Sequence, residues 1–338
     1  DWSHALLSEP EQVLFRRMAV FLGGGDLDAA HAIMGGGIER YQVLDQLVLL
    51  VDKSLVVADD SPHGTRYRLL ETVRQYAMEK LSESREADEI RTRHRDHYTM
   101  LAAALDSGDQ AVQEHLIDRL DVEIDNLRAA FAWSRECADV DRALMLAVAL
   151  QPLWLTRGRI QEGLSWLTAP SDADRSEVSE TRAWASVCRA QLLSFLGRTD
   201  VLNDAEQCLA VVRERGDPAM LSRTLAACGM ICAPGKPELA REYFTEAADF
   251  ARAVNDLGTL GQVLASNAIA GLMLDQRLAE ITAAADEGLR IAEDIGAAFI
   301  ARQCRFALGW AQMYGGDLSG AVTRLGEVIE DAVGANDA

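Results

Sequence analysis

Helix-ending signals recur at a nearly constant interval through the last third of this chain. They fall at Gly216-Asp217, Asn255-Asp256, Gly296-Ala297 and Gly334-Ala335, with spacings of 39, 41 and 38 residues. Weaker breaks lie between them, near residues 197–200, 234–237, 275–277 and 315–317. Each period therefore holds two helices joined by a short turn. A repeat of this length is typical of stacked helix pairs, in which each pair buries its apolar face against its neighbours.

The second helix of each predicted pair carries a small-x-x-x-large-x-x-small pattern. Its members are Ala240, Phe244 and Ala247, then Ala285, Leu289 and Ala292, then Ala321, Leu325 and Val328. Small residues at such spacing let packed helices approach closely. The pattern resembles the second helix of tetratricopeptide repeats, and Leu308-Gly309 resembles the first helix of the same motif. We therefore expect residues 140–338 to form a TPR-like α-solenoid, with four clear helix pairs after a divergent first pair at about 140–167.

The first 83 residues show a different order of elements. Ser8, Pro10 and Glu11 form a helix start with a capping box. Two further helices follow, punctuated by the glycine triplets 23–25 and 35–37, which we interpret as helix stops rather than phosphate-binding loops. Strands at about 54–58 and 66–69 flank a turn rich in Asp, Ser, Pro and Gly. Three helices and a hairpin predict a winged helix at 1–83, then a helical connector at 84–139 and the array at 140–338.

Several separated motifs resemble one protein family. Residues 67–77, Y-R-L-L-E-T-V-R-Q-Y-A, look like the end of the winged helix in STAND-class (NB-ARC or AP-ATPase-like) ATPases, where a strand leads through an M-H-D-L motif into a helix. Residues 121–136 contain E-x-D-N-L-R-A-A-x-x-W-S, which resembles the opening of the helical repeats in LuxR-type transcriptional regulators of actinobacteria. Residues 7–12, L-S-E-P-E-Q, and 50–56, L-V-D-K-S-L-V, match in the same order. The resemblance implies an ATP-binding domain before residue 1 and a LuxR-type DNA-binding domain after residue 338.

One position departs from the family pattern. Leu70 stands where the family has its nucleotide-sensing His, and Glu71 stands where it has Asp. An imidazole can bond to a phosphate, whereas leucine cannot. We therefore expect Leu70, Glu71 and Arg74 to contact the ATPase as an interdomain surface, mainly through packing.

Charge and motif content exclude several other functions. The chain carries 33 Lys and Arg against 53 Asp and Glu, a net charge of −20, whereas nucleic-acid affinity depends on neutralising phosphates. The third predicted helix has a mixed surface without a basic face, so we predict no direct DNA binding; this surface carries Glu39, Arg40, Gln42, Asp45, Gln46, Asp52 and Lys53. The sequence contains no P-loop, G-x-S-x-G or H-E-x-x-H motif. We expect no catalysis and no cofactor in this chain, with ATP or ADP held by the implied upstream domain.

Histidine and cysteine give no convincing metal site. His94 and His97 lie one helical turn apart and could share a metal, but no third ligand accompanies them, so we interpret them as part of a solvated helix face. The six cysteines occur singly in helical patterns, as in a reduced compartment, and the Cys228–Cys232 pair is better explained as core residues than as ligands. No apolar run is long enough to cross a membrane. These features predict a cytoplasmic protein.

The first helices of the pairs should line a concave surface. Aromatic residues and arginine are the favoured anchors of binding sites. The candidate effector contacts on these helices are Trp154, Arg157, Trp184, Arg189, Asn267, Arg302, Arg305, Trp310 and Tyr314. For each of them, core packing or a solvated surface is the competing interpretation.

These observations lead to one function and one alternative. We expect the sensing and regulatory part of a STAND-type signalling ATPase that works as a transcription regulator. In it the winged helix relays nucleotide state from the chain's own ATPase domain, and the repeats bind an effector or partner protein. The alternative is a passive TPR-like scaffold that joins proteins without switching. An intact P-loop upstream of residue 1 would separate the two.

Overall fold

The computed structural model describes residues 4, 6–106, 110–168, 180–198, 202–274 and 277–335. The chain divides into two compact units. One holds residues 1–103 and 118–146, and the other holds 104–117 and 147–338. Both are built almost entirely from helices, which confirms the predicted fold class. Each unit is described by itself.

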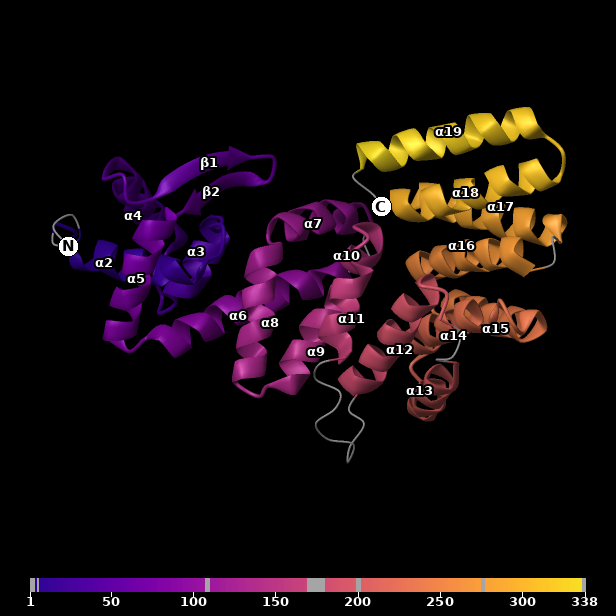
Figure 1. Ribbon diagram of the computed structural model, residues 1–338, viewed down its shortest axis with the longest axis horizontal. Helices are drawn as coiled ribbons and strands as arrows, with labels where there is room; N and C mark the ends of the chain where they lie inside the picture. The colour runs from indigo at the N-terminus through magenta and orange to yellow at the C-terminus, as the bar shows by residue number, and fades with distance from the viewer. Residues whose placement is uncertain are drawn as a thin grey trace. The chain divides into compact units, whose positions relative to one another are not determined.

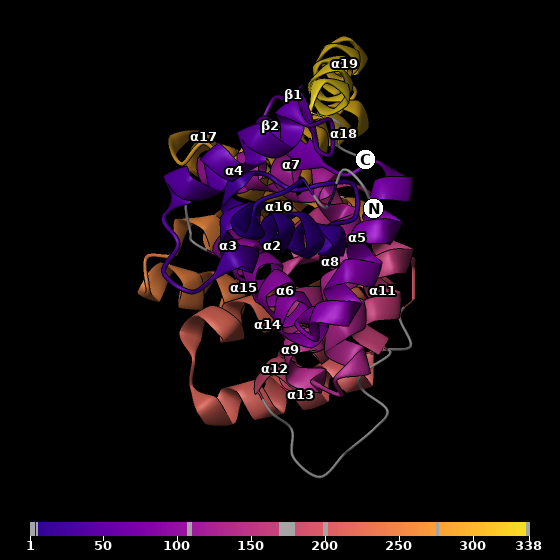
Figure 2. The ribbon, with the colours of Figure 1, turned by 90° about the vertical axis from the view of Figure 1, so that its left-hand side faces the viewer.

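The first unit begins with three helices and a β-hairpin (Figures 1 and 2). Its elements are α2 (Glu9–Arg17), η1 (Met18–Val20), α3 (Leu27–Met34), α4 (Arg40–Asp52), β1 (Val57–Ser61), β2 (Gly64–Arg68) and α5 (Glu71–Ser84). The predicted capping box is present, because Glu11 accepts hydrogen bonds from the amide and the hydroxyl of Ser8 at 2.7 and 2.8 Å. Leu14, Ile33, Leu47 and Leu50 are fully buried where the three helices meet.

The hairpin is antiparallel and pairs Val57 with Arg68 through to Ser61 with Gly64. The strands begin a few residues away from the positions predicted from the sequence. Gly25 adds an isolated bridge to Tyr67, so the first glycine triplet lies against the wing as well as ending a helix. A side chain at Gly24 would place its Cβ 2.6 Å from the carbonyl oxygen of Tyr67. This close approach, at a φ of +88°, requires glycine.

The connecting helices do not form a separate unit. Helices α6 (Ala87–Ala103) and α8 (Ile124–Glu136) pack together and belong to the same unit as the winged helix, and α6 also packs against α3. Helix α7 (Gln110–Val122) begins in the second unit and ends in the first. The E-x-D-N-L-R segment, which we placed in the connector and which resembles the opening of the repeats in related regulators, lies in the same unit as the winged helix.

In the second unit the helix pairs follow one another in chain order, and each pair packs on the next (Figure 1). The region where a single divergent pair was expected contains three helices: α9 (Val140–Ala149), most of which belongs to the first unit, α10 (Gln151–Thr156) and α11 (Ile160–Thr168). The four predicted pairs follow as α12 (Glu180–Phe195) with α13 (Leu202–Arg215), α14 (Pro218–Cys232) with α15 (Pro237–Ala253), α16 (Leu257–Leu274) with α17 (Leu278–Asp294), and α18 (Ala298–Tyr314) with α19 (Leu318–Gly334).

Small residues set the spacing within the pairs. A Cβ at Gly229 would lie 2.9 Å from the ring of Phe244, and a Cβ at Gly309 would lie 2.8 Å from the Leu325 side chain. In these two pairs, the large residue of the second helix thus fills the space beside a glycine of the first helix. This packing confirms the small-large-small pattern inferred from the sequence.

The first helices of the pairs form a continuous layer of the array. Helices α12, α14, α16 and α18 contact one another in order, in addition to contacting their partners within each pair. This layer carries the predicted contact residues from Trp184 to Tyr314, whereas Trp154 and Arg157 lie at α10.

The last helix has an open apolar side. Figure 1 shows α19 as the outermost helix of the array, beside α18. Leu318, Val322, Ile329 and Val333 are 63–74% exposed along it. None of the helices in the described part of the chain is long and apolar enough to cross a membrane.

Candidate protein-contact surfaces

The residues predicted to contact the ATPase lie together at the start of α5. Leu70 precedes the helix and is 47% exposed. Glu71 and Arg74 form a surface ion pair with an oxygen-to-nitrogen distance of 2.9 Å. This pair raises the pKa of the Arg74 guanidinium and lowers that of Glu71, mainly through their side-chain hydrogen bonds.

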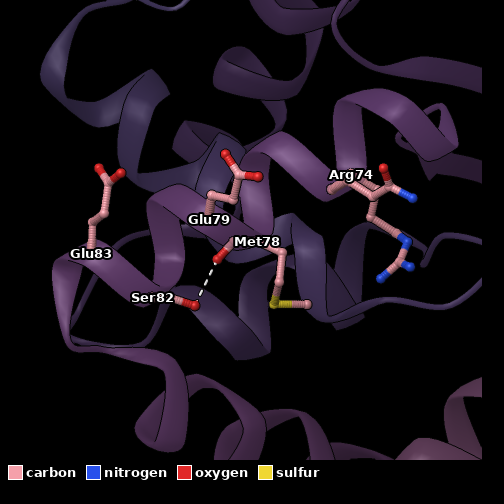
Figure 3. A pocket seen from close by; sticks show the side chains of 6 residues that line it. Arg74, Met78, Glu79, Ser82 and Glu83 are labelled. Atoms are coloured by element: carbon pink, nitrogen blue, oxygen red, sulfur yellow. Dashed lines mark hydrogen bonds between the residues drawn. The ribbon is translucent and has the colours of Figure 1, made fainter.

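A shallow hollow of about 480 Å³ continues from Arg74 along the same helix (Figure 3). It is lined by Arg74, Gln75, Met78, Glu79, Ser82 and Glu83. The Ser82 hydroxyl donates to the carbonyl oxygen of Met78 at 2.9 Å, so the floor of the hollow is the helix itself. The hollow is open and mixed in polarity, which suits a contact with another protein surface better than an enclosed ligand.

A second exposed surface, on α4, is apolar and acidic. Tyr41, Leu44 and Val48 follow each other at helical spacing and are 63%, 36% and 49% exposed. Asp45 and Asp52 lie exposed on the same side of the helix, and neither has an ion pair within the described residues. We call these five residues the α4 face. The α4 face carries no positive charge.

All the cations of the winged helix are already paired. Residues 7–82 contain eight Lys and Arg against eleven Asp and Glu. Each of the eight lies within salt-bridge distance of a carboxylate in its own unit. The pairs are Arg16 and Arg17 with Glu86, Arg40 with Asp28, Lys53 with Glu11, Arg66 with Glu123, Arg68 with Asp59, Arg74 with Glu71, and Lys80 with Glu83.

A buried polar network ties the wing to α8. Glu123 is 4% exposed and pairs with Arg66 of β2; it also accepts from the Tyr98 hydroxyl at 2.9 Å and from Asn126 Nδ2 at 2.7 Å. Arg66 donates further to the carbonyl oxygens of Gly23 and Gly24 at 3.1 and 3.0 Å. The buried Tyr98 hydroxyl beside Glu123 has its pKa raised well above the usual value, first by burial and then by that carboxylate.

Asn126 completes the network from the interior. Its side chain is fully buried, accepts from the Leu22 amide at 2.8 Å, and donates to the Gly24 carbonyl oxygen at 2.8 Å. Glu123 and Asn126 are the Glu and Asn of the E-x-D-N signature. We call Arg66, Tyr98, Glu123 and Asn126 the wing clamp. The signature therefore fixes the wing and the glycine loop to α8.

The expectation that His94 lies on a solvated helix face is wrong. His94 is 3% exposed because α3 and α8 pack against α6 from two sides. Its Nε2 atom donates to Asn126 Oδ1 at 3.2 Å, and burial lowers the pKa of His94 to about 4. His97 is half-buried, and burial likewise lowers its pKa. No cluster of metal-ligating side chains occurs among the residues that the structure describes.

The cysteines of the array are core residues. Cys188, Cys228, Cys232 and Cys304 are buried and unbridged. Burial raises the pKa of the Cys188 and Cys228 thiols to about 12 and that of Cys232 to about 11. Thiols held in the neutral form are poor metal ligands and poor nucleophiles.

Two of the predicted array contacts are not available on the surface. Trp154 is fully buried, donates from Nε1 to the Ala147 carbonyl oxygen at 3.0 Å, and packs edge-on against Trp166. Arg302 is 7% exposed and lies 3.5 Å from Asp331 of α19 and 4.0 Å from Glu114 of α7. The sequence identified their helices, but not that Trp154 fills the core or that carboxylates of other helices surround Arg302.

The remaining candidates lie at least partly on the surface of the first helices. Arg157, Trp184, Arg189 and Asn267 are half-buried. The Arg223 guanidinium lies 5.9 Å from the centre of the Trp184 ring, so this contact joins α14 to α12. Arg305 is about one-third exposed and pairs with Glu293 at 2.9 Å.

An aromatic row on α18 is the most continuous candidate surface of the array. Phe306, Trp310 and Tyr314 are spaced four residues apart, with ring centres 6.0 and 5.9 Å from each neighbour. Phe306 and Tyr314 are 38% and 41% exposed. Sequence reasoning found Trp310 and Tyr314 but missed Phe306, although its spacing from Trp310 matches that of a single helix face.

Comparison with known proteins supports the description of the first domain. Residues 7–82 match the family described as winged helix-turn-helix domain. These residues are a winged helix-turn-helix domain. The matched residues contain the three helices and the hairpin of the structure.

The curated relatives are longer proteins. A Mycobacterium tuberculosis protein named "Putative HTH-type transcriptional regulator" is 47% identical over 348 aligned residues, covering 100% of this chain but 39% of the relative. A Mycobacterium bovis protein of the same description matches equally. An "Uncharacterized protein" of M. tuberculosis is 52% identical over 99 residues, covering 29% of this chain and 25% of its own length. The chain thus spans about two fifths of the regulators that it matches along its whole length.

Two solved structures are distantly similar. One is a STAND protein with a tetratricopeptide repeat sensor from Pyrococcus horikoshii, with a TM-score of 0.44, 14% identity, and coverage of 97% of this chain and 57% of that one. The other is BtubC from P. vanneervenii, with a TM-score of 0.42, 15% identity, and coverage of 74% and 92%. Likenesses this distant carry no functional argument.

Proposed function

We propose that this chain is the sensing and regulatory part of a STAND-type transcription regulator. In this proposal the winged helix contacts a neighbouring ATP-binding domain through α5 and the α4 face, and the helical array binds an effector or a partner protein. Catalysis and nucleotide binding are assigned to other parts of the regulator rather than to this chain. The full-length similarity to longer regulators supports the general role.

One observation supports protein contact rather than DNA reading by the winged helix. Every Lys and Arg in residues 7–82 is neutralised by a carboxylate of its own unit. A protein binds DNA largely by placing Lys and Arg on phosphates and releasing counterions. To bind DNA, this domain would first have to break its own ion pairs, several of which lie in buried or half-buried positions.

The α4 face supports the same proposal. In helix-turn-helix proteins the reading helix presents side chains that donate or accept hydrogen bonds at base edges. Helix α4 instead exposes Tyr41, Leu44 and Val48 beside Asp45 and Asp52. Exposed apolar residues with a polar rim are typical of protein interfaces, whereas carboxylates would repel the DNA backbone.

The second candidate function is direct DNA reading. The family of the domain and the name of the regulators favour it. Fluorescence anisotropy of labelled 30-base-pair duplexes separates the two. We expect no binding below about 100 µM protein at physiological salt, because each Lys and Arg of residues 7–82 is already paired with a carboxylate. Submicromolar binding that weakens with salt and on Arg40→Ala substitution would establish the DNA reader and overturn our proposal for this domain.

The switch itself is tested by thermal shift. An ATP-binding domain of the implied kind is added in trans with ADP or with a non-hydrolysable ATP analogue. We expect one nucleotide state to raise the melting temperature of this chain, because only that state should present the surface complementary to α5. Leu70→Glu and Arg74→Glu should abolish the shift, whereas Arg128→Glu, on the exposed side of α8, should leave it unchanged.

The passive scaffold is the remaining alternative for the array. Equal shifts in both nucleotide states, or none in either, would favour a scaffold that joins proteins without switching. The aromatic row on α18 would then remain the first surface to examine, because exposed aromatic residues are frequent anchors of interfaces. Loss of the shift in the Arg128→Glu control would instead show that the variants act through the fold.

A further inference from the structure

The structure describes the residue before three of the first helices, and in α14 and α16, but not in α18, this residue is a capping aspartate. Asp217 accepts hydrogen bonds from the Ala219 and Met220 amides at the start of α14, and Asp256 accepts from the Thr259 amide at the start of α16. The corresponding residue before α18 is Ala297, which has no capping side chain. Ala297 is 2% exposed and packs with Ile300 and Ala265. The residue at the N-cap position of α18 is therefore part of the hydrophobic core and has no side chain that could cap the helix.

A carboxylate from elsewhere in the chain supplies the missing cap. Glu114 Oε1 accepts a hydrogen bond from the Phe299 amide at 2.6 Å, although the two residues are 185 positions apart. Phe299 is the second residue of α18, where an N-cap side chain would bond. Arg302, one turn further along, lies 4.0 Å from the same carboxylate. The carboxylate is thus held by the positive end of a 17-residue helix and by a buried arginine.

The contact joins α7 to the start of α18. Glu114 belongs to residues 104–117, which lie in the same compact unit as residues 147–338. The aromatic row begins two turns beyond Phe299 on the same helix. A partner that binds the aromatic row and extends toward the N-terminus of α18 therefore contacts residues 113–117. The Glu114 side chain is 35% exposed, so it can be exchanged without opening the core.

We propose that Glu114 is a displaceable latch. When it is closed, it caps α18 and holds residues 113–117 over the start of that helix and over Arg302. When it is open, the start of α18 and Arg302 become accessible, and residues 113–117 of α7 are released. Because Ala297 offers α18 no cap of its own, closing the latch is coupled to ordering the last helix pair. In the closed state, residues of this same chain therefore cover the N-terminal end of α18 and restrict access to it.

Hydrogen exchange with mass spectrometry on the whole 338-residue chain tests the latch. Glu114→Ala should speed exchange about fivefold in 113–117 and also in 299–301, as the loss of a helix cap would. Ala297→Ser gives α18 a local cap with one added atom, and serine caps as well as aspartate does. This variant should keep 299–301 protected while 113–117 exchanges about fivefold faster, because the serine competes with Glu114.

Asp256→Ala is the matched control. It removes a local cap from α16 and should speed exchange there without affecting 113–117. Unchanged exchange of 113–117 in both Glu114→Ala and Ala297→Ser would overturn the latch and show that the buried Leu116 and Ile117 hold the segment instead. The serine variant keeps the test valid even if Glu114→Ala reduces the stability of the array.

Discussion

Replacing Glu123 by alanine is expected to lower the free energy of unfolding of the winged-helix unit by about 4 kcal/mol. The substitution leaves the Arg66 guanidinium without its partner in a largely buried site and removes the acceptor of the Tyr98 hydroxyl. Such a loss exceeds that of a surface ion pair because the remaining charge keeps its desolvation cost. Urea-dependent hydrogen exchange of the α8 amides measures this unit separately from the array.

Glu136→Ala is the control for this prediction. Glu136 also lies on α8 and pairs with an arginine, Arg91, but both side chains are exposed and their separation is 3.4 Å. Its removal should cost less than about 0.5 kcal/mol. Equal effects of the two substitutions would mean that the wing clamp contributes no more than a surface contact and that the wing is held by packing alone.

Acidification is expected to destabilise the same unit through His94. The pKa of His94 is about 4 in the folded protein, against about 6.5 in an unfolded chain, so the unfolded state binds the proton more readily. The stabilisation is complete above pH 6.5 and is lost as the pH falls toward 4. His94 should account for a loss of about 2 kcal/mol between pH 7 and pH 5, and of about 3 kcal/mol by pH 4.

Hydrogen exchange of the α6 and α8 amides across this pH range, corrected for intrinsic exchange rates, measures the effect. His94→Gln keeps a donor toward Asn126 but does not titrate, so its profile should be flatter by about 2 kcal/mol between pH 7 and pH 5. His97 acts in the same direction, because its pKa is also lowered. The carboxylates with lowered pKa, including Asp26 and Glu86, act only below about pH 4.5. An unchanged slope in His94→Gln would assign the acid sensitivity to other groups.

The parts of the fold that sequence reasoning found are those determined by neighbouring residues. The capping box at Ser8, the wing hairpin, and the helix ends at Gly216 and Gly296 all depend on residues within one or two turns. Their chemistry is local, so it can be recognised without knowing what packs on them. The same is true of Phe244 and Leu325, whose spacing from small residues predicts their place in a helix pair.

The errors concern partners that are distant in sequence. Arg66 and Glu123 are 57 residues apart, and Glu114 and Phe299 are 185 apart, so no local pattern indicates either contact. His94 looked solvated because α6 is rich in charged residues, yet α3 and α8 cover the side of α6 on which it lies. Trp154 looked like a binding anchor because aromatic residues serve equally in cores and interfaces. In each case the role of the side chain depends on which helix packs against it, and a local sequence pattern does not indicate that helix.

The open side of α19 also determines the order in which the array should lose structure. In a linear stack each pair is stabilised by the neighbours on which it packs, so a helix that packs on one neighbour is held less firmly than a helix that packs on two. Among the described elements, α19 makes extensive contact only with α18. Its exposed side chains bury little apolar surface on folding and so stabilise the helix little; they are Leu318, Val322, Ile329 and Val333. Fraying on heating should therefore begin at residues 318–334 and pass inward pair by pair, with α18 as the next helix to open.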